Sequence, residues 1–442
     1  MMFTRRKLVD LMVPLIIEQL FLGTIGIVDM LMVAPVGETA ISGISLVNSI
    51  NMLFHSIFSA LAVGGGILCT QYLGRGEEDH GNQAGRQLFF MAGGFSVLAA
   101  AVCCLANPLV LSGLFPTAGP DVLSEGVTYF YLAALSYPCV MIFDACGALF
   151  RGMGSTRIPL LGSVVMSVGN VILNGIFIYG LRWGVFGAGF ASLCAKAAGV
   201  CCLLAVLAGG NHAVSIRKWK SLPKDRVMRR NILRLAVPMA MEDGVFHVGK
   251  LLVQGVVASF GTSAIAANAV ALTIADFTQM PAYAIGLGLT TVVGQCIGAG
   301  EKEQAQMYAR KILMASFLIA AGLSALTWGA AGEITRLYRL TEETAVTAGR
   351  LIRFHALICG LTWILAFNVP CVLRAASDVT FILYVSVFSM WVFRVGCSYL
   401  FREILDVGVL GVWMAMGLDW TFRAAVFTGR LRSGKWLGKA FI

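Results

Sequence analysis

Long apolar runs recur along the whole chain, separated by short polar segments. Each run reaches about 20 residues or more, which is the length that an α-helix needs to cross a bilayer. We therefore predict an all-α polytopic membrane protein with about twelve transmembrane helices. The expected spans are residues 9–33, 46–70, 88–111, 127–150, 158–180, 185–208, 233–258, 267–296, 312–331, 352–373, 380–401 and 407–428.

The two halves of this pattern repeat each other with a constant offset of 224 residues. The matching pairs are Pro14 and Pro238, Glu18 and Glu242, Gly37 and Gly261, Gly74 and Gly298, Gly76 and Gly300, Arg86 and Arg310, and Gly184 and Gly408. Because each half holds an even number of spans, both halves should enter the membrane from the same side. We expect two six-helix lobes related by a pseudo-two-fold axis along the membrane normal. The predicted domains are an N-lobe at 1–210, a basic connector at 211–231 with Trp219 at the membrane surface, and a C-lobe at 232–442.

Composition supports this class of protein. Apolar residues make up 58% of the chain and charged residues only 13%, whereas soluble domains are about one quarter charged. The net charge of +10 comes from short loops, so we expect no nucleic-acid partner. Loops on the N-terminal side hold 22 lysines and arginines, and loops on the other side hold five. This bias predicts that both termini are cytoplasmic. We expect a monomer that crosses the cell inner (plasma) membrane many times.

Charged residues inside the apolar runs are the candidate functional groups, because a charge at that depth is costly. Glu18 and Asp29 lie in the first span, eleven residues apart, so they share one helix face. Glu18 recurs as Glu242 in the second half, which indicates a shared gating or architectural role. Asp29 has Val253 at its repeat position, so we place the coupling site in the N-lobe alone.

The second half carries its own set of intramembrane charges. In the seventh span Asp243, His247 and Lys250 follow Glu242 on one helix face. A buried stripe of this kind could exchange protons or contact substrate, and a purely structural polar network is an equal alternative. Asp276 and Arg394 could pair with each other, and Asp419 and Arg423 have the i, i+4 spacing of a structural ion pair.

The other polar residues and motifs of the sequence do not indicate a functional site. His55 fits a packing role, and Asp144 either lines the cleft or bonds at a helix bend. The segment Gly429–Trp436 has the spacing of a phosphate-binding loop but ends in tryptophan where the magnesium ligand belongs. No hydrolase motif is present, and we expect no enzymatic activity and no cofactor.

The order and spacing of several motifs resemble the multidrug and toxic compound extrusion (MATE) family, in particular its bacterial NorM/DinF-like members. These motifs are VDMLMVAPVG in the first span, QYLGRGEE and QCIGAGEK after the second and eighth, FRGMGSTRIP after the fourth, GNVILNGIFIYG in the fifth and GVFGAGFAS in the sixth. The resemblance implies a secondary antiporter that exports amphiphilic or cationic compounds in exchange for Na⁺ or H⁺.

The resemblance also implies where the coupling ion binds. Asp29 matches the family's first-helix aspartate, Asn170 and Asn174 match its fifth-helix pair, and Ser192 matches its sixth-helix hydroxyl. Many members have aspartate at the position of Asn174, and a neutral residue is commoner at the position of Lys196. Na⁺ remains an alternative at the four matching residues. A lysine able to pair with Asp29 favours protons.

Two other functions remain open at this stage. A flippase for lipid-linked precursors, from the same wider architectural group, would use Lys196, Lys250 and Arg394 to hold a polyanionic head group. A membrane receptor or scaffold without transport activity is a further alternative, although the doubled six-span layout argues against it.

Overall fold

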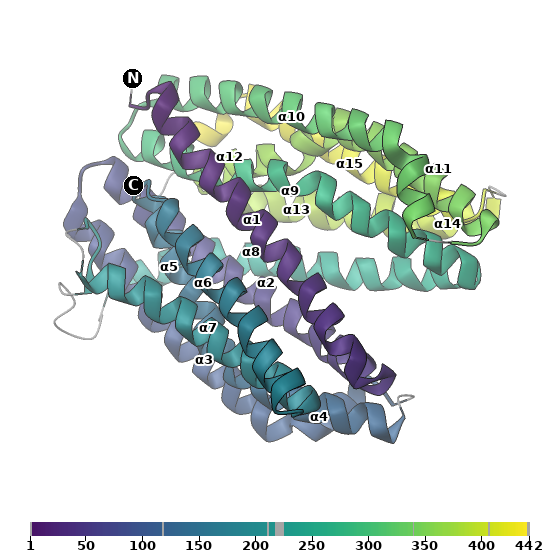
Figure 1. Ribbon diagram of the computed structural model, residues 1–442. Coiled ribbons are helices and arrows are strands. Elements are labelled where there is room, and N and C mark those ends of the chain that lie inside the picture. Colours follow the sequence, from purple (N-terminus) through teal and green to yellow (C-terminus); the bar gives the residue numbers. More distant parts are fainter. Residues whose placement is uncertain are drawn as a thin grey trace. The chain divides into compact units, whose positions relative to one another are not determined.

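The computed structural model describes residues 2–116, 119–209, 212–216, 225–338, 340–404 and 407–439, except for the side chains of residues 25–27. All the regular structure in these residues is helical (Figure 1). The chain divides into two compact units, one formed by Thr4–Ala240 and the other by Met241–Ile442 together with Met1–Phe3. The fold class predicted from the apolar pattern is confirmed.

The first unit contains the first six predicted spans. Its helices are α1 (Arg5–Val33), η1 (Ala34–Val36), α2 (Glu38–Gly74), α3 (Glu78–Leu114), α4 (Pro120–Leu135), α5 (Tyr137–Gly152), α6 (Arg157–Asn174), the π-helix η2 (Gly175–Gly180) and α7 (Gly184–Gly209). Helix α8 (Arg226–Ala258) then crosses from the first unit into the second. The boundary between the units therefore falls inside a helix, nine residues beyond the predicted connector. Part of that connector, including Trp219, lies outside the described residues.

The second unit continues from α8. Its other helices are α9 (Thr262–Gly298), α10 (Lys302–Leu337), α11 (Glu342–Ile358), the π-helix η4 (Cys359–Asn368), α12 (Val369–Ala375), α13 (Val379–Ser389), the π-helix η5 (Met390–Gly396), α14 (Cys397–Ile404), α15 (Val409–Arg432) and η6 (Lys435–Gly438). Two predicted spans, 352–373 and 380–401, are thus continuous α–π–α helices.

Among the described residues, nine helices are long and apolar enough to cross a membrane, and a tenth span is the pair α4 and α5. The two remaining predicted spans, 233–258 and 407–428, form α8 and α15. They lack the same apolar character because they carry Glu242, Asp243 and Lys250 in one case and Asp419 and Arg423 in the other.

The internal repeat has a physical basis in the backbone. Gly37 and Gly261, Gly76 and Gly300, and Gly184 and Gly408 all adopt a positive φ between 54° and 137°. Each pair is separated by the 224-residue offset of the repeat. A side chain is disfavoured at such angles, so the turns between corresponding helices retain glycine in both halves.

One break in the helices matters for the site. Helices α4 and α5 meet at Ser136 with a bend of 42°. Pro138 follows directly, and proline fits the first turn of a new helix while disfavouring a continuous one. The bend turns Ser136 and Tyr137 into the interior of the first unit, where they line a cavity.

Close packing of α2 against α4 provides a test of the fold. A methyl group added at Gly43 would lie 2.8 Å from the Gly126 nitrogen and 2.9 Å from the Val122 oxygen, both backbone atoms that cannot turn aside. We expect Gly43→Ala to lower stability by about 1–3 kcal/mol through overpacking, seen as a lower unfolding temperature in detergent. Gly93→Ala is the control, because no atom lies within 4 Å of its added methyl group. Equal unfolding temperatures for the two variants would contradict the close packing.

Candidate functional site

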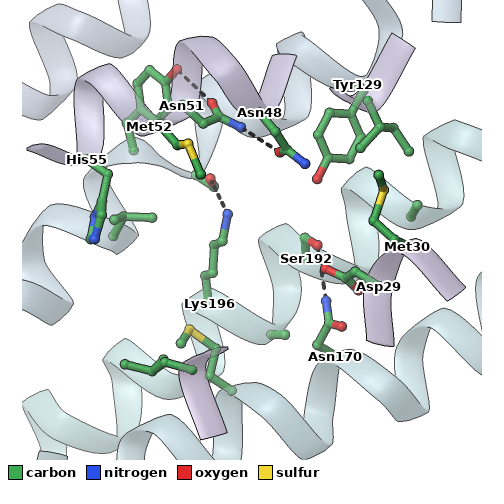
Figure 2. Close-up of a pocket in the computed structure, with 18 of the residues that line it drawn as sticks. Asp29, Met30, Asn48, Asn51, Met52, His55, Tyr129, Asn170, Ser192 and Lys196 are labelled. Carbon is green, nitrogen blue, oxygen red and sulfur yellow. Dashed lines mark hydrogen bonds between the residues drawn. The ribbon is translucent and has the colours of Figure 1, made fainter. Parts of the chain in front are cut away.

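The first unit contains a partly open cavity of about 440 Å³ (Figure 2). Its wall comes from six helices, α1, α2, α4, α5, α6 and α7. The polar groups of the lining are Asp29, Asn48, Asn51, His55, Tyr129, Ser136, Tyr137, Asn170, Ser192 and Lys196, and its apolar groups include Leu22, Met30, Val33, Ile44, Met52, Phe58, Val140 and Met166.

A chain of hydrogen bonds joins the predicted coupling residues on one side of this cavity. The Nδ2 of Asn174 donates to Asp29 Oδ1 at 2.6 Å and to Asn170 Oδ1 at 3.0 Å. Asn170 Nδ2 in turn donates to Ser192 Oγ at 3.1 Å. The structure therefore brings together Asp29, Asn170, Asn174 and Ser192, which the sequence placed on three separate spans.

Local sequence explains this arrangement. Asn170 and Asn174 are one turn apart on α6 and share a face. Helices α6 and α7 approach closely through Gly162 and Gly199, since a methyl group at Gly199 would lie 3.1 Å from the Gly162 oxygen. This contact sets Ser192 opposite Asn170. The π-helix η2 begins directly after Asn174, and π-helical turns are frequent at functional sites.

Lys196 has a different partner from the one predicted. Its Nζ donates to Ser136 Oγ at 3.2 Å, and in the described part of the chain no ion pair within 4.0 Å joins it to Asp29. Ser136 itself donates to the Ala133 carbonyl at 2.6 Å, so its lone pairs remain available to the ammonium. Sequence reasoning missed Ser136 because its position depends on the bend between α4 and α5.

Further polar groups of the cavity were also missed. The Tyr137 hydroxyl donates to Asn51 Oδ1 at 3.0 Å, and His55 Nδ1 lies 3.5 Å from Asp144 Oδ2. The packing role predicted for His55 is therefore wrong. Asn48, Asn51 and His55 repeat every three to four residues on α2, and this helical spacing was the signal that could have found them.

Aromatic rings form the apolar side of the cavity. The Phe58 and Tyr137 ring centroids lie 5.5 Å apart, nearly perpendicular, and those of Phe54 and Tyr137 lie 4.9 Å apart. Such contacts hold the rings in fixed orientations. The cavity thus combines a rigid aromatic wall with a carboxylate and an ammonium at its surface.

A Na⁺ ion at this site would need oxygen ligands from the side chains around Asp29. Among the described residues, no group of three or more His, Cys, Asp or Glu side chains could hold a metal ion. The Asp29 and Asn170 oxygens already accept from Asn174, while the buried Asn174 Oδ1 has no hydrogen-bond partner. A hard cation would be accommodated if the Asn174 amide turned to present that oxygen. With the amide turned, the four residues would offer Na⁺ oxygen ligands of the kind it prefers, and binding of Na⁺ stays a prediction.

The repeated glutamates occupy equivalent surroundings in the two units. Glu18 is 1% exposed, and its Oε1 lies 3.8 Å from Arg151 Nη1. Glu242 accepts from Arg374 at 2.7 Å and from Ser386 at 2.8 Å. Each arginine precedes by three residues a position of positive φ, Gly154 or Ser377. These contacts agree with an architectural role, and the gating role stays a prediction.

The remaining predicted charges of the second unit have partners of several kinds, and their action as one proton or substrate network stays a prediction. Arg394 lies 3.9 Å from Asp419, so its predicted pairing with Asp276 is wrong. Lys250 is exposed and stands over the Phe246 ring, and the carboxylate that attracts its ammonium is that of Asp276. The expected pair of Asp419 with Arg423 is present at 2.8 Å.

In the described residues, about ten apolar helical spans and a polar cavity inside one unit define a polytopic membrane protein whose interior can accept a solute. A family model described as MatE matches residues 14–176 and 238–400. The two matched ranges have the same 224-residue displacement as the internal repeat. The chain belongs to the MATE family of multidrug efflux transporters, as its motifs suggested.

Individual relatives cover nearly the whole chain. Probable multidrug resistance protein NorM of Thermotoga maritima is 23% identical over 447 residues, which span 99% of this chain and 94% of the relative. The uncharacterized transporter YisQ of Bacillus subtilis is 26% identical and spans 96% and 94%, respectively. A crystal structure of MATE in the straight conformation superposes with a TM-score of 0.90 at 18% identity, covering 97% of this chain and 96% of that one. This chain therefore resembles MATE proteins in its fold as well as in its sequence.

Proposed function

We propose that this protein is a proton-coupled antiporter that exports amphiphilic compounds through alternating access of its two halves. The observation that carries the proposal is the position of Asp29. Its carboxylate lies in the wall of an internal cavity and is tied to α6 by Asn174. Protonation of Asp29 would therefore change both the charge in the cavity and the contact between α1 and α6. If one conformation of the transporter favours the protonated form, proton binding shifts the equilibrium toward that conformation.

Protons suit this site better than Na⁺. Among the described residues, Asp29 is the only carboxylate in the lining of the cavity, and one of its oxygens already accepts from Asn174. A proton can add to the other oxygen without any rearrangement, whereas Na⁺ needs the Asn174 amide to turn. The Lys196 ammonium in the same lining further disfavours a second cation.

The proposal includes a location and an orientation. The protein would reside in the cell inner (plasma) membrane with both termini in the cytoplasm, because the basic residues gather in the loops on that side. It would act as a monomer, since each chain supplies both halves of the alternating-access machine. Substrate would enter the cavity from the cytoplasm or the inner leaflet.

A flippase for lipid-linked precursors is less well supported. A polyanionic head group calls for several cationic side chains around one cavity. Lys196 is the only lysine or arginine in the lining of the described cavity. Lys250 and Arg394, the other two candidates, belong to the second unit.

Transport from proteoliposomes tests the proposal and the choice of ion. Vesicles holding the full chain would be loaded with ethidium, a cationic amphiphile, or dansyl-glycine, an anionic one. Efflux would be followed with a pH gradient alone, a Na⁺ gradient alone and no gradient. We expect efflux of at least one probe with the pH gradient only. Efflux with the Na⁺ gradient alone would reject proton coupling, and no gradient-driven efflux of either probe would reject the antiporter.

A further inference from the structure

The cavity contains one positive charge that has no carboxylate partner within 4.0 Å among the described residues. Lys196 lines the cavity together with apolar and aromatic side chains. Its one hydrogen bond to a described residue goes to a neutral group, the Ser136 hydroxyl, at 3.2 Å. An ammonium has three N–H donors, so two remain for a ligand or for water.

The one carboxylate in the described lining makes its hydrogen bond to another residue. Asp29 accepts from Asn174 at 2.6 Å. Figure 2 shows Lys196 and Asp29 with their charged ends apart, the lysine extending away from the Asn170–Ser192 side of the cavity. The cavity therefore presents a carboxylate and an ammonium that attract each other but are not joined by an ion pair within 4.0 Å, so the compensation of the ammonium is incomplete.

This charge is costly unless a ligand compensates it. A cation inside a partly apolar cavity loses part of its hydration, and one hydroxyl replaces little of it. An anionic group placed on Lys196 would restore the balance through a charge-assisted hydrogen bond. Phe58 and Tyr137 line the same cavity and offer an aromatic surface for the rest of such a ligand.

We propose that the cavity of the first unit binds amphiphiles that carry an anionic group, with that group on Lys196 and Ser136 and the apolar body against Phe58 and Tyr137. The inference rests on the proposed function, because it names the chemical class of what the exporter takes. A separate cationic group on the ligand is compatible with it, since Asp29 can receive that group on the other side of the cavity.

Binding to the purified full-length protein in detergent tests this assignment without any gradient. Three probes share one dansyl ring system: dansyl-glycine is anionic, dansyl-glycinamide is neutral and dansyl-cadaverine is cationic. The rise of dansyl fluorescence reports binding. We expect dansyl-glycine to bind about tenfold tighter than the amide, as one charge-assisted hydrogen bond would give, and dansyl-cadaverine to bind more weakly than the amide. Equal affinities, or a preference for the cation, would overturn the assignment without use of any variant.

Substitutions of Lys196 test whether this residue causes the preference for the anionic probe. Lys196→Gln should remove the difference between dansyl-glycine and its amide by weakening the binding of dansyl-glycine, and Lys196→Arg should retain the difference. Lys7→Gln is the matched control, because Lys7 is an exposed lysine at the start of α1 in the same unit, and it should behave as wild type. A preference that survives in Lys196→Gln would overturn the role of this lysine. Since these measurements need no flux, their failure is distinct from failure of gradient-driven efflux.

Discussion

Replacing Asp29 with asparagine is expected to reduce gradient-driven efflux to the level of protein-free vesicles. The variant keeps the shape of the side chain and an oxygen able to accept from Asn174, so the packing of α1 against α6 should persist. It removes the one carboxylate of the cavity lining. Asparagine cannot take up or release a proton near neutral pH. The proton gradient can therefore no longer drive efflux through this residue.

Two measurements separate this loss from misfolding. Asp29→Asn should unfold at the wild-type temperature in detergent and should still bind the dansyl probes. Asp10→Asn is the control on the same helix, because Asp10 forms a half-exposed pair with Arg157 at 3.0 Å, and surface pairs of this kind contribute only about 0–1 kcal/mol. It should transport as wild type. Wild-type efflux by Asp29→Asn would show that coupling does not use this carboxylate.

The N-lobe cluster was predictable because each of its members carries a signal within its own helix. Asn170 and Asn174 show their shared face by spacing alone, and Asp29 is conspicuous as a charge within an apolar run. That these residues and Ser192 belong together came from the resemblance to a family. The fold was accessible for a related reason, since span length and the repeated glycine turns are local properties of the chain.

The partner of Lys196 could not be found in this way. It depends on the 42° bend between α4 and α5, which determines where Ser136 points. A proline marks the position of such a bend without giving its direction or angle. The angle between two helices thus decides which of several polar side chains pairs with a charged group such as the Lys196 ammonium.

Arg394 illustrates the same limit in the second unit. The sequence offers Arg394 more than one intramembrane acid, among them Asp276 in the eighth predicted span and Asp419 in the twelfth. Arg394 lies within the π-helix η5, where the wider turn changes the face that each residue presents. No spacing rule relates residues of different spans, so opposite charge alone led to the wrong partner, whereas the Asp419–Arg423 pair within the regular helix α15 follows the i, i+4 rule.

The Asp419 cluster is expected to show the largest effect of any single substitution on stability. Asp419 is fully buried and accepts from Arg423 at 2.8 Å and from Ser389. Arg394 lies 3.9 Å away, and its Nε and Nη1 have no hydrogen-bond partner in the described structure. Asp419→Asn would leave two buried guanidinium groups without a counter-charge. Loss of one member of a buried ion pair costs about 3–5 kcal/mol, so we expect a large fall in unfolding temperature and in yield of monodisperse protein.

A second substitution identifies the cause of that destabilisation. If unbalanced positive charge is responsible, adding Arg394→Met to Asp419→Asn should recover part of the lost stability, because it removes the surplus guanidinium while keeping an apolar side chain of similar length. Glu333→Gln provides the control, since Glu333 and Arg336 form a pair whose side chains are 74% and 77% exposed, and no measurable change is expected. A wild-type unfolding temperature for Asp419→Asn would show that the buried cluster contributes no net stability. If the double variant is less stable than Asp419→Asn, unbalanced charge is not the cause of the lost stability. The cause would then be lost packing, which removal of the Arg394 side chain makes worse.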